Sequence, residues 1–525
     1  MTISVLPTHK IKSIAEEIVR EIEKGRINSK EDLLKYKNIL ASKYKLSRVP
    51  SNSELLSVVK EREEIRKVLM RKPVRTISGV AIIAVMSSPY PCPHGRCIPC
   101  PGGPPYSPQS YTGKEPASLR AMRNKFDPYL QTKERLKQLK AIGHPTDKID
   151  LIVMGGTFPA RDFAYQNWFI KRCYDAMNGK NAKSLEEAKK LNETALHRCI
   201  GLTIETRPDW CQLQHVERML YMGATRVEIG AQILDDRILY EMGRGHTVMD
   251  IIEATRILKD AGFKVCYHIM PGLPGSNRDK DIASFRRMFM DERFRPDMLK
   301  IYPTLVVKPS KLYEKWLKGE YKPLDEEEAI EIVSEMKKYV PEWVRIQRIE
   351  RDIPSNLIEM GIKRSNLREL VRNYMKKRGW ECRCIRCREI GHKCAGKEIG
   401  ELEVMKREYI ASGGREIFIS VENREKDVIV AYCRLRIPSM PYIKENSAIV
   451  RELKVHGPMV EIGRKDAKKW QHKGLGKILI HEAEKIALKW GKERLLILSG
   501  IGAKEYYRKI GYKEYGVYMA KSLTE

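Results

Sequence analysis

The sequence lacks several features that would place it in other protein classes. No stretch contains 18 consecutive apolar residues, so no membrane-spanning helix is predicted. The first 25 residues contain no apolar signal core and have the pattern of an amphipathic helix, which predicts a cytoplasmic chain. Internal repeats and low-complexity stretches are also missing. The hydrophobic fraction of 42% is enough for several packed cores and excludes a mainly disordered chain.

Acidic side chains are too few to balance the basic ones. The 98 Lys and Arg residues against 68 Asp and Glu leave a formal charge of +30. Such a surface could serve solubility alone or bind a polyanion, and we favour nucleic acid. Part of the excess gathers in two segments, with 18 basic against 10 acidic residues over 1–75 and 12 against four over 361–400.

The length of 525 residues suggests three or four domains. Residues 1–75 are predicted to form a basic helical extension, because Ile11, Ile14, Ile18 and Ile22 make a narrow apolar stripe. It could be a cap packed on the main body or an arm that binds nucleic acid.

Residues 76–365 alternate between apolar strand-like runs and amphipathic helices. The predicted strands are 81–86, 151–154, 199–205, 226–230, 264–270 and 298–302, and the predicted helices are 162–177, 185–196, 212–222, 248–261 and 279–290. This alternation is typical of a parallel sheet covered by helices. About six such units fit a partial or closed barrel, with reactive groups at the carboxyl ends of the strands.

Two further units follow. Residues 366–400 form a short, basic, cysteine-rich linker. Residues 401–525 are predicted to be a compact α+β unit with strands at 416–421, 428–435, 448–454 and 494–498, and with helices from about 475 and at 504–509.

The 12 cysteines include two tight clusters, which in a chain without a secretion signal indicate metal ligands and not disulfides. Cys92, Cys97 and Cys100 lie in a proline-rich loop after the first strand. Four-iron clusters usually take four cysteines, so three would leave one iron open for another ligand. A structural zinc completed by His94 is the alternative, but a position at the mouth of a barrel favours the iron–sulfur cluster.

Other strand ends carry candidate ligand-binding residues. Gly155 and Gly156 follow the second strand and permit a close backbone approach, although a simple tight turn would also use them. The polar candidates at the next two strands are Glu205, Arg207, Arg226, Glu228 and Gln232. They could equally form buried ion pairs between strands.

The second cluster contains Cys382, Cys384, Cys387 and Cys394. Four thiolates without a surrounding pocket fit a closed tetrahedral zinc site that would stabilise a segment lacking its own core. A second iron–sulfur cluster is the rival interpretation. His392 could replace Cys394 as the fourth ligand.

Near the C-terminus, a glycine-containing loop opens a helix. The residues are Gln471, Gly474, Leu475, Gly476 and Lys477. Glycines there free backbone N–H groups for a phosphate, and the helix N-terminus adds partial positive charge. Tyr506 and Tyr507 follow in a later helix, where ordinary packing does not explain two adjacent tyrosines, because neighbouring residues point in different directions.

Together these motifs give the chain a family resemblance. The cysteine triple and the glycine motif resemble those of radical S-adenosylmethionine (SAM) enzymes, and the C-terminal loop and helix resemble the GNAT acetyltransferase fold. The combination resembles the catalytic subunit of Elongator and its stand-alone archaeal and bacterial relatives, specifically at SSPYPCPHG, VMGGTF, GLTIETRPDWC, VRELKVHG, QHKGLG and YYRKIGY. It implies a radical SAM partial (β/α) barrel followed by a GNAT domain of α+β type.

The resemblance also implies roles for residues. The cysteine triple would hold a [4Fe-4S] cluster whose open iron binds SAM, contacted by Gly155, Gly156, Thr157, Glu205 and Gln232. The strand Glu452, Leu453, Lys454 and Val455 would pair with the pantetheine of acetyl-CoA, and the loop from Gln471 to Lys477 would hold its pyrophosphate. Tyr506 or Tyr507 could protonate the CoA sulfur. Lys148 would contact acetyl-CoA from the barrel side.

The family adds a carboxymethyl group to C5 of the wobble uridine of tRNA. The resemblance implies that a 5′-deoxyadenosyl radical takes a hydrogen atom from the acetyl methyl group and that the resulting carbon radical adds to C5. Loss of an electron and a proton and hydrolysis of the thioester would complete the product. The anticodon stem-loop would contact the N-terminal extension and the cysteine-rich linker. Accessory subunits or a homodimer stay open as partners. The alternatives are a protein lysine acetyltransferase with a structural barrel and a non-enzymatic tRNA-binding scaffold.

Overall fold

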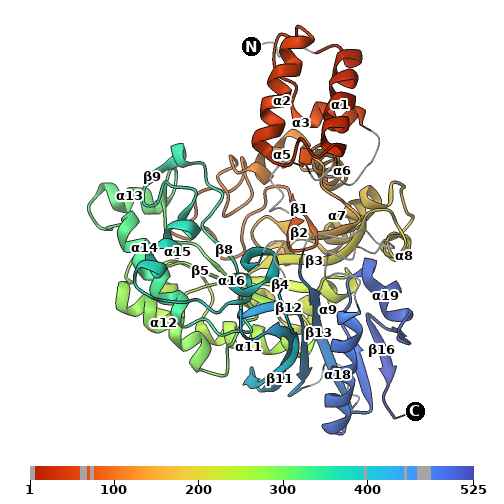
Figure 1. The fold of residues 1–525 in the computed structure, drawn as a ribbon. Helices are drawn as coiled ribbons and strands as arrows, with labels where there is room; N and C mark the ends of the chain where they lie inside the picture. Colours follow the sequence, from red (N-terminus) through yellow and green to blue (C-terminus); the bar gives the residue numbers. More distant parts are fainter. Residues whose placement is uncertain are drawn as a thin grey trace.

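A computed structural model describes residues 6–59, 65, 68–70, 76–394, 399–440, 442, 446–457 and 474–524. Three helices come first, α1 (Thr8–Glu23), α2 (Lys30–Lys43) and α3 (Asn52–Val58). Ser29 and Ser51 cap α2 and α3 through reciprocal capping boxes. The helices enclose a small apolar core of their own and stand at one end of the molecule (Figure 1). Within the described ranges, no helix is long and apolar enough to cross a membrane.

The central domain is a half-barrel of seven parallel strands in the order β1-β2-β3-β4-β5-β6-β8. Their bounds are β1 (Ala81–Met86), β2 (Lys148–Met154), β3 (Arg198–Thr206), β4 (Arg226–Gln232), β5 (Lys264–Ile269), β6 (Met298–Ile301) and β8 (Arg345–Ile349). The predicted partial barrel is therefore confirmed. The strand β8 was not expected from the sequence, because arginine and glutamine occupy three of its five positions.

Helices flank this sheet (Figure 1). They are α5 (Pro116–Arg123), α6 (Pro128–Ala141), α7 (Phe163–Asn178), α8 (Leu185–Asn192), α9 (Leu213–Tyr221), α10 (Asp236–Glu241), α11 (Val248–Asp260), α12 (Arg278–Met290), α13 (Lys311–Leu317) and α14 (Glu326–Lys338). Short 3-10 turns lie at Phe158–Ala160, Pro208–Trp210 and Ser355–Leu357, and β7 (Val306–Val307) pairs with β9 (Ile358–Met360). One continuous apolar core lies between the strands and the helices.

The cysteine-rich linker contains α15 (Leu367–Lys377), α16 (Ile385–Arg388) and α17 (Ile390–Lys393). Helix α15 packs against α14, and its apolar residues belong to the core of the barrel, so the boundary expected at 365/366 falls inside this packing. Ile385 and Ile390 instead pack against the C-terminal domain. The linker thus fastens one domain to the other.

The C-terminal domain is a second seven-stranded sheet in the order β10-β11-β12-β13-β14-β16-β15. The strands are β10 (Glu403–Ala411), β11 (Gly414–Asn423), β12 (Val428–Ile437), β13 (Ser447–Val455), β14 (Arg494–Ile497), β15 (Lys513–Tyr515) and β16 (Tyr518–Ser522). The helical pieces are α18 (Leu475–Lys489), the 3-10 turn Ile501–Ala503 and α19 (Lys504–Arg508). Helix α18 covers one face of the sheet.

The other face of this second sheet packs directly against the half-barrel. Ile449 and Leu496 join the barrel core, whereas their neighbours Val450 and Ile497 join the core beneath α18. This division follows from the two-residue period of a strand. Gly500 permits the closest approach, since a Cβ there would lie 2.1 Å from the carbonyl oxygen of Ile200 in β3.

Candidate active site

A single cavity of about 670 Å³ runs along the inner face of the half-barrel. Its walls are alternate residues of the strands, such as Ile82 and Ala84 of β1 and Asp150 and Ile152 of β2. The loop with the three N-terminal cysteines lines it at the carboxyl ends of the strands. At the amino ends, the first residues of several strands line the cavity, such as Arg226, Met298 and Arg345. Tyr432, Glu452 and Lys454 of the C-terminal domain complete the lining there.

The cysteine loop is held in place by hydrogen bonds to its sulfurs and backbone. Gln109 accepts from the backbone N–H of Cys92 at 3.2 Å and donates to the carbonyl oxygen of Gly95 at 3.0 Å. The Oγ1 of Thr157 lies 3.5 Å from the Sγ of Cys92, and the backbone N–H of Ser110 donates to the Sγ of Cys100 at 3.3 Å. All three cysteine side chains are thereby directed to one end of the cavity.

The donor set fits a multi-iron cluster. The sulfurs of Cys92, Cys97 and Cys100 do not all lie within 4.8 Å of one another, so they are too spread to share one ion. Each cysteine of a four-iron cluster binds a different iron, which requires such spacing. Burial raises the pKa of the Cys92 and Cys100 thiols, so a bound cation is needed to hold them as thiolates. His94, the zinc-ligand alternative, has its Nε2 3.0 Å from the Sγ of Cys97.

Polar groups without partners surround this end of the cavity. Gly155 and Gly156 have φ values of 129° and 85°, which a side chain would strain, and a Cβ on Gly156 would lie 3.7 Å from the Sγ of Cys92. Gln232 also has a positive φ of 67°, and its buried Oε1 has no hydrogen-bond partner. Buried nitrogens of Arg207 and Arg244 are unsatisfied as well. These orphaned atoms fit a polar ligand beside the cysteines.

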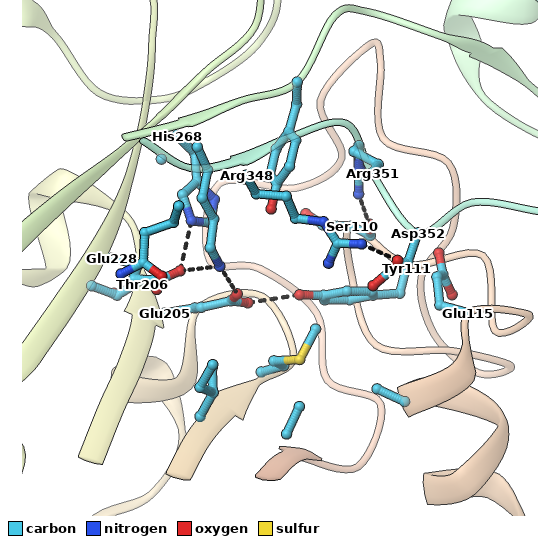
Figure 2. A pocket seen from close by; sticks show the side chains of 18 of the residues that line it. Ser110, Tyr111, Glu115, Glu205, Thr206, Glu228, His268, Arg348, Arg351 and Asp352 are labelled. Carbon is cyan, nitrogen blue, oxygen red and sulfur yellow. Dashed lines mark hydrogen bonds and ion pairs between the residues drawn. The ribbon is translucent and has the colours of Figure 1, made fainter. Parts of the chain in front are cut away.

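The wall beyond the cysteines is a chain of buried ion pairs and hydrogen bonds (Figure 2). Tyr111 donates to Glu205 at 2.6 Å, and the Nζ of Lys300 lies 3.5 Å from the same carboxylate and also contacts Glu228. The Nε2 of His268 lies 2.9 Å from the carboxylate of Glu228. Burial would raise the pKa of Glu228, but Lys300 and His268 outweigh it and hold that pKa well below its usual range.

Arg226 belongs to this buried chain. It forms ion pairs with Asp150 at 3.2 Å and with Glu228 at 3.5 Å. The ion-pair interpretation of these strand residues therefore describes the structure, while Glu205, Arg226 and Glu228 still line the cavity. Arg207 pairs with Asp209 at 2.8 Å and also lines it.

Strand β13 of the C-terminal domain lies between the barrel cavity and the core beneath α18. Its pairing with β14 ends at Val450 and Ile497, and no other described strand pairs with the following residues on that side. Glu452 and Lys454 face the barrel cavity, whereas Leu453 and Val455 pack toward the core beneath α18. One strand thus forms a wall of both compartments. The open edge is where an extended ligand could pair with the backbone.

The N-terminus of α18 lies beside this edge. Gly474 begins the helix with a φ of 86° and no side-chain cap, and Leu475, Gly476 and Lys477 follow in the first turn. A Cβ on Gly476 would lie 2.6 Å from the hydroxyl of Tyr506 and 3.6 Å from Leu453. Free backbone N–H groups here suit a phosphate. Gln471 lies outside the described residues.

The two tyrosines of α19 have different surroundings. Tyr506 is 37% exposed, and burial of its other parts raises its pKa to about 12. Tyr507 is buried in the core beneath α18 against Tyr512. Only Tyr506 therefore presents its hydroxyl toward the first turn of α18.

Lys148, the residue expected to contact acetyl-CoA from the barrel side, is the first residue of β2. The two-residue period puts it on the same face as Asp150, which lines the cavity. Its position is at the amino ends of the strands, on the side of the C-terminal domain.

The second cysteine cluster is smaller than expected. The sulfurs of Cys382, Cys384 and Cys387 lie within 4.8 Å of one another, which fits a metal or iron–sulfur site. Cys394 does not join them. It packs against Ile390 and Val428, because α17 turns toward β12. His392 pairs with Glu389 at 3.0 Å, so neither expected fourth ligand is at the site.

Sequence reasoning missed several residues of the cavity. Arg244 donates to the Sγ of Cys97 at 3.4 Å, and Gly245 lets the segment approach closely, since a Cβ there would lie 2.7 Å from that of His94. Both lie in the RGHT motif, which was the available signal. Tyr111, His268 and Lys300 gave no comparable signal, because single polar residues within apolar runs do not reveal their partners.

Fold and site together define a class of enzyme, a radical SAM half-barrel joined to a GNAT acyltransferase domain. Family comparisons match the ELP3 N-terminal domain at 11–77, the Radical SAM superfamily at 89–287, the Radical SAM C-terminal domain at 296–377 and the Acetyltransferase (GNAT) family at 392–512. The two radical SAM matches imply a [4Fe-4S] cluster and SAM, and the GNAT match implies acetyl-CoA.

Full-length relatives agree. The chain is 52% identical over 98% of both chains to the tRNA uridine(34) acetyltransferase of Methanocaldococcus jannaschii, and 42% identical over 97% of its length and 96% of the relative to Elongator complex protein 3 of Homo sapiens. The solved structure of Methanocaldococcus infernus Elp3, with residues 1–46 deleted, is 49% identical. It covers 85% of this chain and 100% of its own, with a TM-score of 0.76. The chain therefore belongs to the Elongator Elp3 family.

Proposed function

We propose that this chain modifies C5 of uridine 34 in tRNA by adding a carboxymethyl group derived from acetyl-CoA. The tRNA uridine(34) acetyltransferase of the archaeal relative indicates the nucleoside, and the observation that carries the chemistry is the continuous cavity of the half-barrel. It reaches from the three cysteines to β13, so a group held at the GNAT domain and a base in the barrel could share one continuous space.

Radical chemistry explains why two such domains are joined. Simple acyl transfer would attach the acetyl group to carbon 5 through its carbonyl carbon, whereas a carboxymethyl group is attached through the former methyl carbon, whose C–H bond must first be activated. A four-iron cluster with SAM supplies, when bound, a carbon radical able to take a hydrogen atom from a methyl group. Cys92, Cys97 and Cys100 would hold the cluster, and Gly156, Thr157 and Gln232 would position SAM, with their backbone and orphaned polar atoms as ligands.

The chain's other residues would bind and orient the acyl donor. The open edge of β13 would pair with the pantetheine, and the first turn of α18 would hold the pyrophosphate. Tyr506 stays protonated at neutral pH because its pKa is raised to about 12, so it could give a proton to the CoA sulfur. Lys148 would support the acyl donor from the barrel side.

The test is an anaerobic assay with reduced protein, SAM, acetyl-CoA and tRNA, read by mass spectrometry of nucleosides. The expected product is carboxymethyluridine at position 34, and Cys97→Ala should remove it. Product formation by Cys97→Ala would contradict the radical route. An acetylated product would point to plain acyl transfer, and acetylation of a basic peptide without tRNA would favour a lysine acetyltransferase.

We also propose that the second cysteine cluster binds zinc. Three sulfurs within 4.8 Å fit ligands of one tetrahedral ion, because Zn–S bonds of about 2.3 Å bring sulfurs close together. Cys384 is fully buried, and hydrogen bonds from Cys382 and Cys387 lower its pKa well below the usual value. Metal analysis of Cys97→Ala should find zinc without iron. Iron bound to that variant, with the absorption of a cluster, would contradict the zinc assignment.

A further inference from the structure

Two cations lie at the end of the cavity farthest from the cysteines, without a partner among the described residues. Arg386 comes from α16 in the cysteine-rich linker, and Lys454 comes from β13. Both line the cavity and are half-buried. In the part of the chain that the structure describes, neither forms a hydrogen bond or an ion pair.

Every nearby carboxylate is already engaged. Glu389 binds Arg345 through two hydrogen bonds of 2.6 and 3.2 Å and also lies 2.9 Å from the Nδ1 of His456. The carboxylate of Glu452 accepts from Arg434 at 2.8 Å. Asp150 is paired with Arg226. The acidic groups of this region therefore balance three arginines and leave Arg386 and Lys454 uncompensated.

Arg345 is balanced by Glu389 but still acts on Lys454. Burial lowers the pKa of Lys454, and the charge of Arg345 lowers it further. Two half-buried cations without an ion pair are unfavourable beside a cavity unless an anion joins them. A protein interior that keeps such an arrangement has the electrostatics of an anion site.

We propose that Arg386 and Lys454, next to Arg345, form a binding site for a phosphodiester group of RNA. This rests on the proposed function, in which uridine 34 must leave its stack for its C5 to enter the cavity. The phosphates of that nucleotide move with it. Guanidinium and ammonium groups are the usual phosphate ligands of proteins.

Coenzyme A is a less suitable source of the anion. Lys454 points into the barrel, whereas its neighbours Leu453 and Val455 face the compartment with the first turn of α18. The pyrophosphate assigned to that turn is therefore on the other side of β13 from Lys454. A small carboxylate or free phosphate would fit the same charges, so the experiment must separate these from RNA.

The experiment measures the affinity of the full chain for tRNA over a series of salt concentrations. The slope of log affinity against log salt counts phosphate contacts at about 0.7 to 0.9 each. Lys454→Gln and Arg386→Gln should each reduce the slope by about one contact. Arg386→Lys should keep the slope, because it keeps the charge. Lys489→Gln, which removes an exposed lysine of α18 outside the cavity, is the matched control and should change nothing.

A chemically altered RNA identifies the phosphate. An anticodon stem-loop with uncharged methylphosphonates on either side of uridine 34 should bind the wild type with the same reduced slope. The slope for this altered RNA should not fall further when the protein carries Lys454→Gln, because the RNA no longer has the phosphate charge that Lys454 would contact. Additive losses would overturn the proposal, and so would a Lys454→Gln slope equal to that of Lys489→Gln. Competition by inorganic phosphate without any slope change would assign the site to a small anion.

Two controls keep the outcomes separate. Removing an uncompensated cation should not lower the Tm of the free protein, so a fall in Tm would mark a folding defect. Metal content is measured for Arg386→Gln, because Arg386 lies next to Cys384 and Cys387 in the sequence and its replacement could disturb the metal site. Lys454 is far from these cysteines in the sequence, so Lys454→Gln is free of this complication. A wild type that binds tRNA but forms no modified uridine would refute the proposed function and leave the slopes interpretable. A wild type that binds no tRNA would refute both.

Discussion

Adjacent residues in this protein can have unrelated environments, and α19 shows the clearest case. Tyr506 and Tyr507 are consecutive, yet one hydroxyl faces the first turn of α18 and the other side chain fills a core. The sequence could not distinguish them, because α19 has only five residues and the face it presents depends on the sheet beside it. Both tyrosines were therefore equal candidates until the structure separated them.

Replacing Tyr506 by Phe should slow release of CoA by about 10²-fold, because a positioned proton donor contributes about that much. Tyr507→Phe removes a hydroxyl without a role at the site and should keep the rate. The measurement is thiol release from acetyl-CoA in the complete assay. Equal losses in both variants would contradict the assignment.

Gly156→Ala should impair the cysteine end of the cavity. Its φ of 85° costs a side chain about 1–2 kcal/mol, and the added Cβ would occupy space 3.4 Å from Gln109 and 3.7 Å from the Sγ of Cys92, where the cluster and SAM would lie. We expect lower iron content and lower affinity for SAM. Gly179→Ala at a similar φ of 73° has open space around it and serves as the control. Matching iron contents would show that the close approach is unimportant.

At the scale of elements, the sequence predicted most strands but not which compartment each side chain faces. The run 448–454 was recognised as a strand, and β13 spans Ser447–Val455. Its barrel-facing residues could not be assigned, because they depend on packing between two sheets. Strand β8 was missed since its polar positions face the cavity, where Arg345 and Gln347 have partners that a local pattern cannot reveal.

The N-terminal helices should contribute to RNA affinity through charge alone. Lys12, Lys30 and Lys35 are exposed on α1 and α2, and their replacement by Gln should weaken tRNA binding and reduce its salt dependence. Acetyl-CoA affinity should not change, because these helices are remote from α18 (Figure 1). Glu31→Gln on α2 is the opposite control and should strengthen binding slightly. No effect of the triple variant would make this unit a structural cap.

At the scale of the whole molecule, buried ion pairs join the two catalytic domains. Arg451 of β13 donates to Asp297 of the barrel at 2.7 and 2.6 Å and to Glu416 of β11 at 2.7 Å. Arg436 connects Asp260 with Glu416. The two folds followed from sequence patterns, but their docking did not, because these partners are up to 176 residues apart.

The docked arrangement should be sensitive to acid. Burial would raise the pKa of Asp297, but Arg451 and Lys259 outweigh it and hold that pKa well below the usual range. Because the pKa of Asp297 is lower in the folded protein than in the unfolded chain, its ion pairs contribute fully to stability above the unfolded pKa of about 4. This contribution is lost as the pH falls from there through the folded pKa. Limited proteolysis should release separate domains near pH 3 but not at pH 7.

Asp297→Asn should weaken docking at all pH values. It leaves Arg451 and Lys259 without their main partner, at a cost of about 3–5 kcal/mol. The variant should therefore cleave between domains at pH 7, with little further change on acidification. Asp291→Asn, at an exposed surface pair with Arg293, is the control. Acid sensitivity equal to that of the wild type would show that other carboxylates control docking.

The shared strand β13 also limits how this architecture can be recombined. Its residues alternate between two compartments, so exchanging the GNAT domain for that of another acetyltransferase would also replace Glu452 and Lys454 in the lining of the barrel cavity. Only grafts that retain Glu452 and Lys454 while varying Leu453 and Val455 would preserve the cavity. The two domains therefore have to be redesigned together, because a change in β13 reaches both compartments.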